Sequence, residues 1–499
     1  MKDRMYKKGD VLEVVITDIG IGGEGIGKLD GYTLFIKDAV IGDTVKCSIM
    51  KAKKGYAYAH LDDVIVRSPY RTDPRCPVAR SCGGCQLQEM TYERQLEYKE
   101  SKVINNLVRL GGFEKEYIES IAEPIIRMEN DPFRYRNKAQ YPIGYDRNGE
   151  LTAGFYAGRT HSIIPVNDCL LGCEENKQIL KIVLDWMRRT DTSAYDETAG
   201  TGVVRHALIR KGFATGEIMV CLVINDDRLR ETDSLVEELR KVPGMTSISY
   251  SVNTDDTNVI MGDDYVTIYG SETISDSIGD LAFKISPLSF YQVNPVQTRK
   301  LYEKALSYAG LTGKETVWDL YCGIGTISLF LARDAGKVYG VEIVPRAIED
   351  AVDNAKLNGI TNVEFYVGKA EEVIDRIWTG SADRPDDVVA YEMTHPDVIV
   401  VDPPRKGCDE LCINTMLKMN PKRIVYVSCD SATLARDLKL LCEGGYELKR
   451  ICPCDMFGNT VHVEVATLLE RVRYAKEYIQ IGIDAEDYYR IKDAQKESR

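Results

Sequence analysis

The feature that most constrains this 499-residue sequence is a regular alternation of short apolar runs and helical patterns from Leu301 onward. Each run has the length of one strand, and the segments between runs repeat apolar residues at helical spacing. Strands that alternate with helices form a parallel sheet with helices on both faces. The sequence therefore predicts a Rossmann-like, doubly wound α/β domain over residues 283–471. Its expected strands are Thr316 to Leu320, Lys337 to Val341, Val363 to Val367, Val398 to Val401, Arg423 to Val427 and Val461 to Leu468.

Two further units are expected before this domain. Residues 1–67 contain short alternating runs separated by glycines, which predicts a five-stranded barrel of the oligonucleotide-binding kind. Residues 68–282 carry a cysteine-rich segment and then strand patterns with turn signals, which predicts a mainly β central domain. The helical stretch 92–124 is expected to pack on the α/β domain, and residues 472–499 are expected to form an extension without a predicted role.

The lysines of the predicted barrel are candidates for contacts with nucleic acid, because barrels of this kind bind strands on a curved basic face. Exposed lysines on a strand also serve to prevent aggregation, so the pattern alone leaves both interpretations open. The lysines in question are Lys46, Lys51, Lys53 and Lys54.

Composition excludes several classes of protein. The formal net charge of −13 argues against a protein that coats nucleic acid without selectivity, since neutralising phosphates needs an excess of Lys and Arg. No apolar run is long enough to span a bilayer, and no apolar segment follows the first basic residues, so a cytoplasmic protein without membrane contact is predicted. Its fourteen cysteines are then expected to be free thiols, metal ligands or catalytic groups. No obligate protein partner is evident.

A glycine pair lies in the first strand-to-helix turn of the α/β domain. Gly323 and Gly325 let the backbone approach a nucleotide-like ligand, and Glu342, at the end of the next strand, is suited to accept hydrogen bonds from two ribose hydroxyls. The dinucleotide fingerprint would have a third glycine where Ser328 stands. An S-adenosylmethionine site is therefore favoured over a nicotinamide site, and the alternative is a tight turn without ligand.

The fourth strand ends in Asp402-Pro-Pro-Arg-Lys-Gly407. Ligands of open α/β folds collect at the carboxyl edge of the sheet, which places Asp402 over the predicted cleft. Two consecutive prolines stiffen this loop, so it is suited to hold a flat base or the methyl donor. The alternative is a rigid loop with no ligand.

A thiol and an acid are expected at the same edge. Cys429 follows the fifth strand, and a thiolate that adds to carbon 6 of a uridine makes carbon 5 able to attack a sulfonium methyl group. The adduct must then lose its carbon 5 proton, for which Glu464, at the start of an otherwise apolar strand, is the candidate base, with His462 on the same face. Alone, Cys429 would be interpreted as an inert buried cysteine and Glu464 as a structural acid.

Three cysteines, Cys76, Cys82 and Cys85, lie within ten residues and enclose two glycines that let the chain fold around a metal. Cys169 or Cys173 could supply a fourth ligand. Zinc and an iron-sulfur cluster both accept four thiolates, and the spacing does not separate them. A metal centre is predicted here.

Together these motifs resemble the TRAM-domain-containing RNA (uracil-5-)-methyltransferases, particularly the iron-sulfur branch that modifies 23S ribosomal RNA. The resemblance covers residues 9–470 and includes five motifs in the same order. They are Ser289-Phe-Tyr-Gln-Val-Asn294, Asp319-Leu-Tyr-Cys-Gly-Ile-Gly325, Val401-Asp-Pro-Pro-Arg405, Val427-Ser-Cys429 with Thr433-Leu-Ala-Arg-Asp437, and Asp455-Met-Phe457 with Glu464.

The resemblance implies a TRAM barrel, a central domain with an iron-sulfur cluster and a class I methyltransferase domain. It implies that Cys429 is the nucleophile and Glu464 the base, and that 23S ribosomal RNA is the substrate. By the same resemblance, adenosylmethionine is bound by Gln292, Tyr321, Glu342 and Asp402. A 4Fe-4S cluster would be held by Cys76, Cys82, Cys85 and Cys169. The segments that look like RNA contacts are Phe133-Arg-Tyr-Arg-Asn-Lys138 and Arg205-His206.

Other functions remain as alternatives. A transfer RNA uridine methyltransferase would use the same chemistry, but relatives with that role look shorter and lack the barrel and the cysteines. An iron-sulfur oxidoreductase that binds a nicotinamide would need no Cys429. A noncatalytic RNA-binding protein would leave the pair Cys429 and Glu464 unexplained, and DNA cytosine methylation is disfavoured because no proline precedes Cys429.

Overall fold

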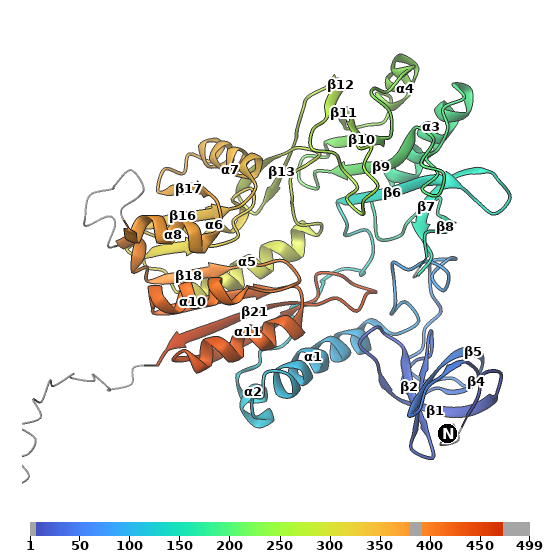
Figure 1. Cartoon of the computed structure of the whole chain (residues 1–499), viewed down its shortest axis with the longest axis horizontal. Coiled ribbons are helices and arrows are strands. Elements are labelled where there is room, and N and C mark those ends of the chain that lie inside the picture. The colour runs from blue at the N-terminus through green and yellow to red at the C-terminus, as the bar shows by residue number, and fades with distance from the viewer. Residues whose placement is uncertain (1–5, 159, 380–391, 473–499) are drawn as a thin grey trace, which may run out of the picture.

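The computed structural model describes residues 6–158, 160–379 and 392–472, and it contains three large sheets connected by helices (Figure 1). The predicted C-terminal extension, residues 472–499, lies outside the described residues apart from Val472. Within the described ranges, no helix is both long enough and apolar enough to cross a membrane.

The N-terminal unit is a closed barrel, as the sequence predicts. Its inward-facing residues, such as Leu34 and Val45, are fully buried, while the glycines allow close packing. A Cβ on Gly27 would lie 2.5 Å from Val14 Cγ2, so this position accepts no side chain without a shift. The strands, in the order β1-β2-β3-β5-β4, are β1 (Val11–Ile19), β2 (Gly25–Leu29), β3 (Tyr32–Ile36), β4 (Thr44–Ala52) and β5 (Tyr56–Val66).

The central unit is built on a seven-stranded sheet in the order β12-β11-β10-β9-β6-β7-β8. Helices α3 (Glu175–Arg189) and α4 (Thr232–Leu239) cover one face, and the hairpin of β13 (Ile274–Ile278) and β14 (Leu281–Ile285) shares a core with residues of the other face. The strands are β6 (Lys138–Tyr145), β7 (Leu151–Tyr156), β8 (Ile163–Pro165), β9 (Val204–Lys211), β10 (Ile218–Ile224), β11 (Met245–Val252) and β12 (Val266–Gly270).

The C-terminal unit is the predicted α/β sheet, in the order β17-β16-β15-β18-β19-β21-β20. Helices cover both faces of the sheet and enclose two separate apolar cores, one on each side. The strands are β15 (Thr316–Asp319), β16 (Lys337–Glu342), β17 (Val363–Val367), β18 (Val398–Val401), β19 (Arg423–Ser428), β20 (Tyr446–Cys454) and β21 (Glu464–Arg471). The helices are α5 (Pro295–Ala309), α6 (Thr326–Ala332), α7 (Pro345–Leu357), α8 (Ala370–Thr379), α10 (Glu410–Met419) and α11 (Ser431–Glu443).

Two details of this sheet differ from the sequence prediction. The last strand begins at Glu464 instead of Val461 and runs antiparallel to β19, so His462 belongs to the preceding loop and shares no strand face with Glu464. The edge strand β20 was not predicted, because Lys449, Arg450 and Pro453 interrupt its apolar pattern. Residues 455–463 connect β20 to β21, and the two strands pair in antiparallel orientation.

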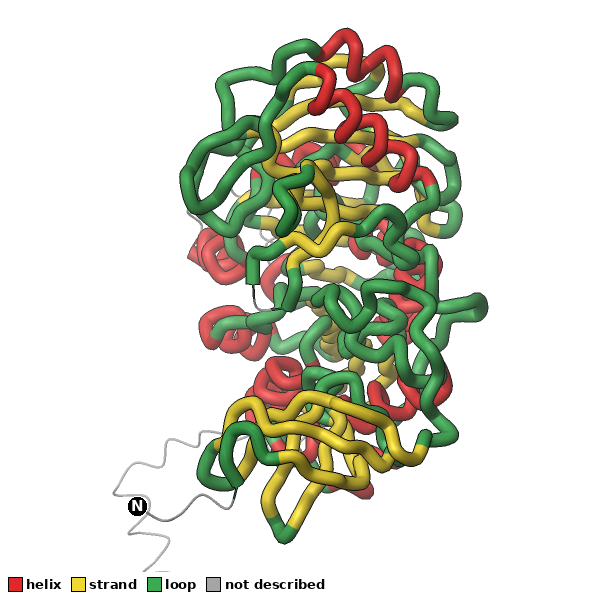
Figure 2. The backbone as a smooth tube through the Cα atoms, turned by 90° about the vertical axis from the view of Figure 1, so that its right-hand side faces the viewer, coloured by secondary structure: helices red, strands yellow, loops and turns green. Residues whose placement is uncertain are grey.

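One long helix connects the barrel to the α/β unit (Figure 1), and Figure 2 shows the barrel at the opposite end of the molecule from the central sheet. Helix α1 (Tyr92–Arg109), followed by α2 (Lys115–Ile121), packs against α11 and places Val103 and Leu107 in the core of that unit. Near its N-terminus, Tyr98 Oη donates to the carbonyl of Gly20 in the barrel at 3.0 Å. The helix therefore contacts both units at once.

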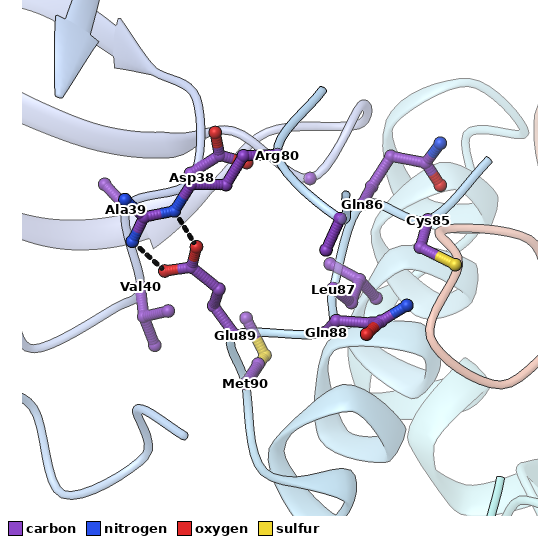
Figure 3. A pocket seen from close by; sticks show the side chains of 12 residues that line it. Asp38, Ala39, Val40, Arg80, Cys85, Gln86, Leu87, Gln88, Glu89 and Met90 are labelled. Carbon is purple, nitrogen blue, oxygen red and sulfur yellow. Dashed lines mark hydrogen bonds and ion pairs between the residues drawn. The ribbon is translucent and has the colours of Figure 1, made fainter. Parts of the chain in front are cut away.

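The barrel is also joined to the cysteine-rich segment by buried charges. Arg71 donates to Asp43 at 2.7 Å and also pairs with Glu89, and Arg80 donates to Glu89 at 2.5 Å. Figure 3 shows the pair of Arg80 and Glu89, with Asp38 of the barrel beside Arg80. The space between the two segments is only about 20 Å³, which is too small for an organic ligand and indicates a closed interface.

Candidate active site

Five neighbouring strands each present one acid or thiol at the same edge of the α/β sheet. Parallel strands bring their carboxyl ends to one edge, and the antiparallel β21 brings its first residue to that edge. In the order of the strands, the residues are Glu342, Asp319, Asp402, Cys429 and Glu464. The structure thus brings together four of the predicted site residues and adds Asp319, which the sequence analysis did not single out.

Cys429 and Glu464 are cross-strand neighbours. Strands β19 and β21 are antiparallel, and Ser428 pairs with Val465. One residue further along, the same register places Cys429 opposite Glu464. Glu464 is only 4% exposed, while Cys429 is partly exposed. A nucleophile that a substrate can reach therefore stands next to a buried carboxyl group.

Burial and neighbouring acids raise the pKa values of three carboxyl groups in this row. Burial, with Glu342 nearby, raises the pKa of Asp319 to about 6, and burial with Asp319 raises that of Asp402 to about 7. Burial with Asp402 raises the pKa of Glu464 to about 8. Because adjacent carboxylates cannot all ionise cheaply in a dry site, the row favours a cationic ligand beside it.

The carboxyl groups of this row also affect the Cys429 thiol. Burial and the carboxylates of Glu464 and Asp402 raise its pKa to about 12, and the guanidinium of Arg405 opposes this shift. Arg405 also lowers the pKa of Glu464. This arginine therefore stabilises the two ionised forms that a thiolate attack and a proton abstraction need.

The glycine turn leaves room for a ligand. Gly323 has φ +54° and nothing within 4 Å of the position that a Cβ would occupy, so its exposed side is open. Behind it, Ser328 Oγ donates to Asp319 Oδ2 at 2.6 Å, whereas the buried Asp319 Oδ1 has no partner among the described residues. An unpaired carboxylate oxygen beside an open glycine fits a ligand with a cationic group.

The other predicted cofactor residues lie around this turn. The Gln292 side chain bonds to Tyr302, whose hydroxyl lies 3.3 Å from Thr326 Oγ1, at the start of α6. Glu342 Oε1 accepts from the Val344 amide at 3.0 Å. The Tyr321 hydroxyl is turned toward buried cysteines, Cys408 and Cys412, and burial raises its pKa. Tyr321 can therefore offer a ligand its ring edge or backbone but not its hydroxyl.

The Asp402 loop is held by the helix that follows Cys429. Asp437 Oδ2 accepts from the Cys408 amide at 2.8 Å and from the Tyr426 hydroxyl at 2.6 Å. Thr433 Oγ1 donates to the carbonyl of Arg405 at 3.1 Å. The thiol and the Pro-Pro loop are thus positioned by the same helix, α11.

Helix α1 and neighbouring segments fix the loop that leads to Glu464. The buried Lys99 pairs with Asp455 at 2.5 Å, and the Tyr92 hydroxyl donates to the same carboxylate at 2.8 Å. Asn294 donates to the carbonyl of Met456 at 3.0 Å, and Lys102 donates to that of Val461 at 2.8 Å. No sequence signal singled out the lysines of α1, since their positions fit an ordinary amphipathic helix.

Several cations surround the mouth of this site. Burial together with Arg405, Lys102, Lys99 and Arg136 lowers the pKa of His462 to about 4. His462 is consequently neutral at physiological pH. Lys99 is paired with Asp455 and Lys102 bonds to a backbone carbonyl, so Arg405 and Arg136 are the groups that can meet an anion. In a chain with net charge −13, this concentration of positive charge is suited to the phosphates of a nucleic acid.

The four predicted cluster cysteines meet at one cavity of about 400 Å³. Cys76, Cys82, Cys85 and Cys169 line it together with Arg136 and Lys138. Burial, together with Arg210 and Arg136, lowers the pKa of Lys138 to about 7. The cavity thus combines thiols with basic groups, a set that fits an anionic iron-sulfur cluster.

Cys173 is placed differently. Its sulfur donates to the carbonyl of Arg136 at 3.4 Å, and it does not line the cavity. Over residues 6–158, 160–379 and 392–472, no group of three or more His, Cys, Asp or Glu side chains is arranged to hold a metal ion. The four thiols surround a cavity instead of closing on one ion, and zinc needs ligands about 2.3 Å from its centre.

The predicted RNA segments divide into two groups. Arg205 donates to the carbonyls of Asn253 and Asp255 at 2.7 and 2.9 Å, and Arg134 forms two 2.7 Å bonds with Asp168, so both arginines are used within the fold. His206 is 7% exposed. The Arg136 side chain faces the cavity and the loop of His462, where an RNA contact stays a prediction.

Comparison with known families agrees with this site. Residues 202–472 match the model of the tRNA (Uracil-5-)-methyltransferase family, and residues 6–61 match the TRAM domain. The chain is 49% identical over 464 residues to an uncharacterized RNA methyltransferase of Halalkalibacterium halodurans, covering 93% of this chain and 97% of the relative. A similar protein of Clostridium acetobutylicum is 46% identical over 468 residues, covering 93% of this chain and 98% of the relative.

A solved structure shares the fold of most of this chain. The Pyrococcus abyssi tRNA (uracil-54, C5)-methyltransferase, in complex with S-adenosyl-L-homocysteine, matches with a TM-score of 0.70 and 25% identity. The match covers 92% of this chain and all of that one. The fold of most of this chain is therefore shared with a transfer RNA uridine methyltransferase.

The family match spans more than half of the chain, and it includes every strand that carries the acid row and Cys429. The barrel matches the second model over almost its full length. The chain therefore belongs to the TRAM-containing RNA (uracil-5-)-methyltransferases, which use S-adenosylmethionine as methyl donor.

Proposed function

We propose that this enzyme methylates carbon 5 of a uridine in 23S ribosomal RNA through a covalent adduct with Cys429. The observation that carries the mechanism is the cross-strand placement of Cys429 beside Glu464, at the edge where the cofactor strands end. A single active-site base or thiol would serve many reactions, but this pair matches the two demands of pyrimidine carbon methylation.

The steps follow from the order of the residues. The Cys429 thiolate, stabilised by Arg405, adds to carbon 6 of the uridine, and the electron pair of the carbon 5–carbon 6 double bond makes carbon 5 nucleophilic. Carbon 5 takes the methyl group from the sulfonium. Glu464, in its carboxylate form, then removes the carbon 5 proton, the double bond re-forms, and the thiolate leaves carbon 6.

The methyl donor is proposed to lie along the first part of the acid row. Gly323 provides the open backbone, Glu342 the ribose contact, and Asp402 a carboxylate for the cationic part of the donor. Gln292 and Tyr321 complete this set. A bound cation would favour the ionised form of Asp402 and so lower its raised pKa.

Ribosomal RNA is proposed as the substrate because the chain resembles the iron-sulfur branch and places its four matching cysteines at one cavity. Transfer RNA is the second candidate, favoured by the likeness to the Pyrococcus abyssi enzyme. A target base inside folded RNA must leave its stack in either case. A cytoplasmic location fits both substrates.

The substrate is tested with labelled adenosylmethionine, unmodified 23S ribosomal RNA fragments and unmodified transfer RNA. We expect label in 5-methyluridine of the ribosomal fragments, with a kcat/KM at least about 100-fold above that for transfer RNA. This ratio corresponds to a difference of about 2.7 kcal/mol in transition-state stabilisation. A reversed preference would transfer the substrate assignment to transfer RNA and leave the mechanism intact. Nuclease mapping of the label identifies the uridine.

The cavity cysteines are proposed to hold a 4Fe-4S cluster that ties residues 76–85 to Cys169 and has a structural role. Purified without oxygen, the wild type should carry about four iron and four sulfide per chain, and Cys85→Ala should lose them. Cys173→Ala is the matched control, because this nearby thiol does not line the cavity, and it should keep the full iron content. Stoichiometric zinc, or iron loss in the control alone, would contradict the assignment.

A further inference from the structure

The barrel carries three aromatic rings in mutual contact on its outer surface, which are called here the aromatic trio: Phe35, Tyr56 and Tyr58. Their ring centroids lie 5.6 to 5.8 Å apart. Phe35 pairs with Tyr58 across β3 and β5, and Tyr56 is 37% exposed. Neighbours on these strands, Leu34 and Ala57, point into the barrel core, so the trio is not needed to fill it.

The position of the trio is where barrels of this kind bind strands of nucleic acid. Their binding face is formed by the second and third strands, with the loops after the first and fourth strands at its rim. Phe35 lies on β3, opposite Ile26 of β2, and Tyr56 directly follows the β4–β5 loop. A Cβ on Gly20, in the β1–β2 loop, would lie 3.7 Å from the Phe35 ring. The trio therefore occupies this face between both loops.

Positive charge borders the trio. Lys53 and Lys54 form the β4–β5 loop with Gly55, both are exposed, and no ion pair is recorded for either within the described part of the chain. The Tyr32 hydroxyl bonds to the carbonyls of Lys53 and Tyr56 at 2.7 Å each, which fixes the loop beside the rings. Rings flanked by unpaired lysines fit bases and phosphates of one strand.

Lys46, which the sequence grouped with these lysines, is separated from them. It lies opposite Glu13 on β1 and opposite Asp63 on β5, so acids flank it on both sides. The structure thus divides the predicted basic face into a part that borders the trio and a part that is balanced by carboxylates. This division provides a matched control on the same barrel.

The trio is held in place relative to the active site. In the β1–β2 loop, a Cβ on Gly23 would lie 3.1 Å from Val461 Cγ1, three residues before Glu464. The same loop accepts the hydrogen bond of Tyr98 on α1. The buried ion pair between Arg71 and Asp43 of the barrel adds a second attachment. A strand bound to the trio is therefore kept at a set distance from Cys429.

We propose that the aromatic trio is a stacking platform for unpaired bases of the substrate RNA, with Lys53 and Lys54 on the adjoining phosphates. The platform would bind single-stranded nucleotides beside the target uridine without reading their sequence, because every base has a flat face. This proposal rests on the proposed function, because it assumes that the bound RNA carries the target uridine. The platform selects substrates with an unpaired segment next to the modified uridine.

The test measures binding of the full chain to two fluorescent single-stranded RNA probes of equal length, one with bases and one made of abasic nucleotides. Tyr56→Leu and Phe35→Leu keep apolar bulk but remove the flat ring. Each should weaken binding to the probe with bases by about 5- to 100-fold and leave the abasic probe unaffected. Lys53→Gln with Lys54→Gln should weaken both probes and reduce the salt dependence, by about 0.7 in slope per lost phosphate contact.

Lys46→Gln is the control and should bind both probes like the wild type. Equal affinity of wild type and Tyr56→Leu for the probe with bases would overturn the platform and leave the rings as a contact for a protein. Equal losses on both probes would overturn it as well, because they would indicate a structural role. Since no methyl transfer is measured, a failed assignment of the uridine or of Cys429 leaves this result unchanged.

Discussion

Replacing Cys429 with alanine should abolish methyl transfer, reducing kcat by about 10⁴-fold or more, the scale on which loss of a covalent nucleophile acts. The Cys429 thiol is partly exposed at the sheet edge, whereas Cys454, which pairs with Glu464 from the other side on β20, is fully buried and out of reach of a substrate. Without thiolate addition, uridine carbon 5 has too little electron density to attack the methyl group. Release of tritium from carbon 5 of labelled RNA should stop together with methyl incorporation.

The matched control is Cys442→Ala, because Cys442 lies at the far end of α11, the helix that begins two residues after Cys429. It should keep near-normal activity. Binding of adenosylhomocysteine, measured by calorimetry, should be similar in both variants and shows that the Cys429→Ala protein is folded. Undiminished transfer by Cys429→Ala would mean that the covalent mechanism is wrong.

Replacing Glu464 with glutamine should trap the enzyme on its RNA. Addition and methyl transfer precede the step that needs the base, so they should still proceed, while loss of the carbon 5 proton slows by about 10² to 10⁴-fold, the range for general base catalysis. A methylated covalent RNA–protein complex that survives denaturation should accumulate in stoichiometric amount. Gel electrophoresis with labelled methyl donor detects it directly.

Two variants sharpen this result. Glu470→Gln changes an acid of the same strand, β21, that pairs with Arg423 at the opposite end, and it should form no lasting complex. Cys429→Ala combined with Glu464→Gln should form none either, since the adduct needs the thiol. A double variant that still crosslinks would place the nucleophile elsewhere.

The pH dependence of adduct release follows from the same carboxyl group. Burial and Asp402 raise the pKa of Glu464 to about 8, and only the ionised form can accept the proton. The rate of adduct release in the wild type should therefore increase as the pH rises toward 8. The rate for the Glu464→Gln complex should show no such increase.

The fold was largely predictable because its main signals are local. The glycines of the barrel, the alternation of strand and helix after Leu301 and the cysteine spacing each lie within short stretches of sequence. The prediction was wrong where local pattern and tertiary context differ. Charged residues and Pro453 hid β20, and the antiparallel pairing of β21 shortened the predicted strand so that it begins at Glu464.

The sequence by itself determined which residue types could do the chemistry: a thiol and an acid at strand ends, a glycine turn and three cluster cysteines with Cys169 or Cys173 as the fourth. Only the tertiary structure decided which of them meet. It placed Cys429 beside Glu464, added Asp319 to the row, chose Cys169 over Cys173 at the cavity and separated Lys46 from the aromatic trio. The physical reason is that strand order, register and burial depend on contacts between distant segments, which no local spacing encodes.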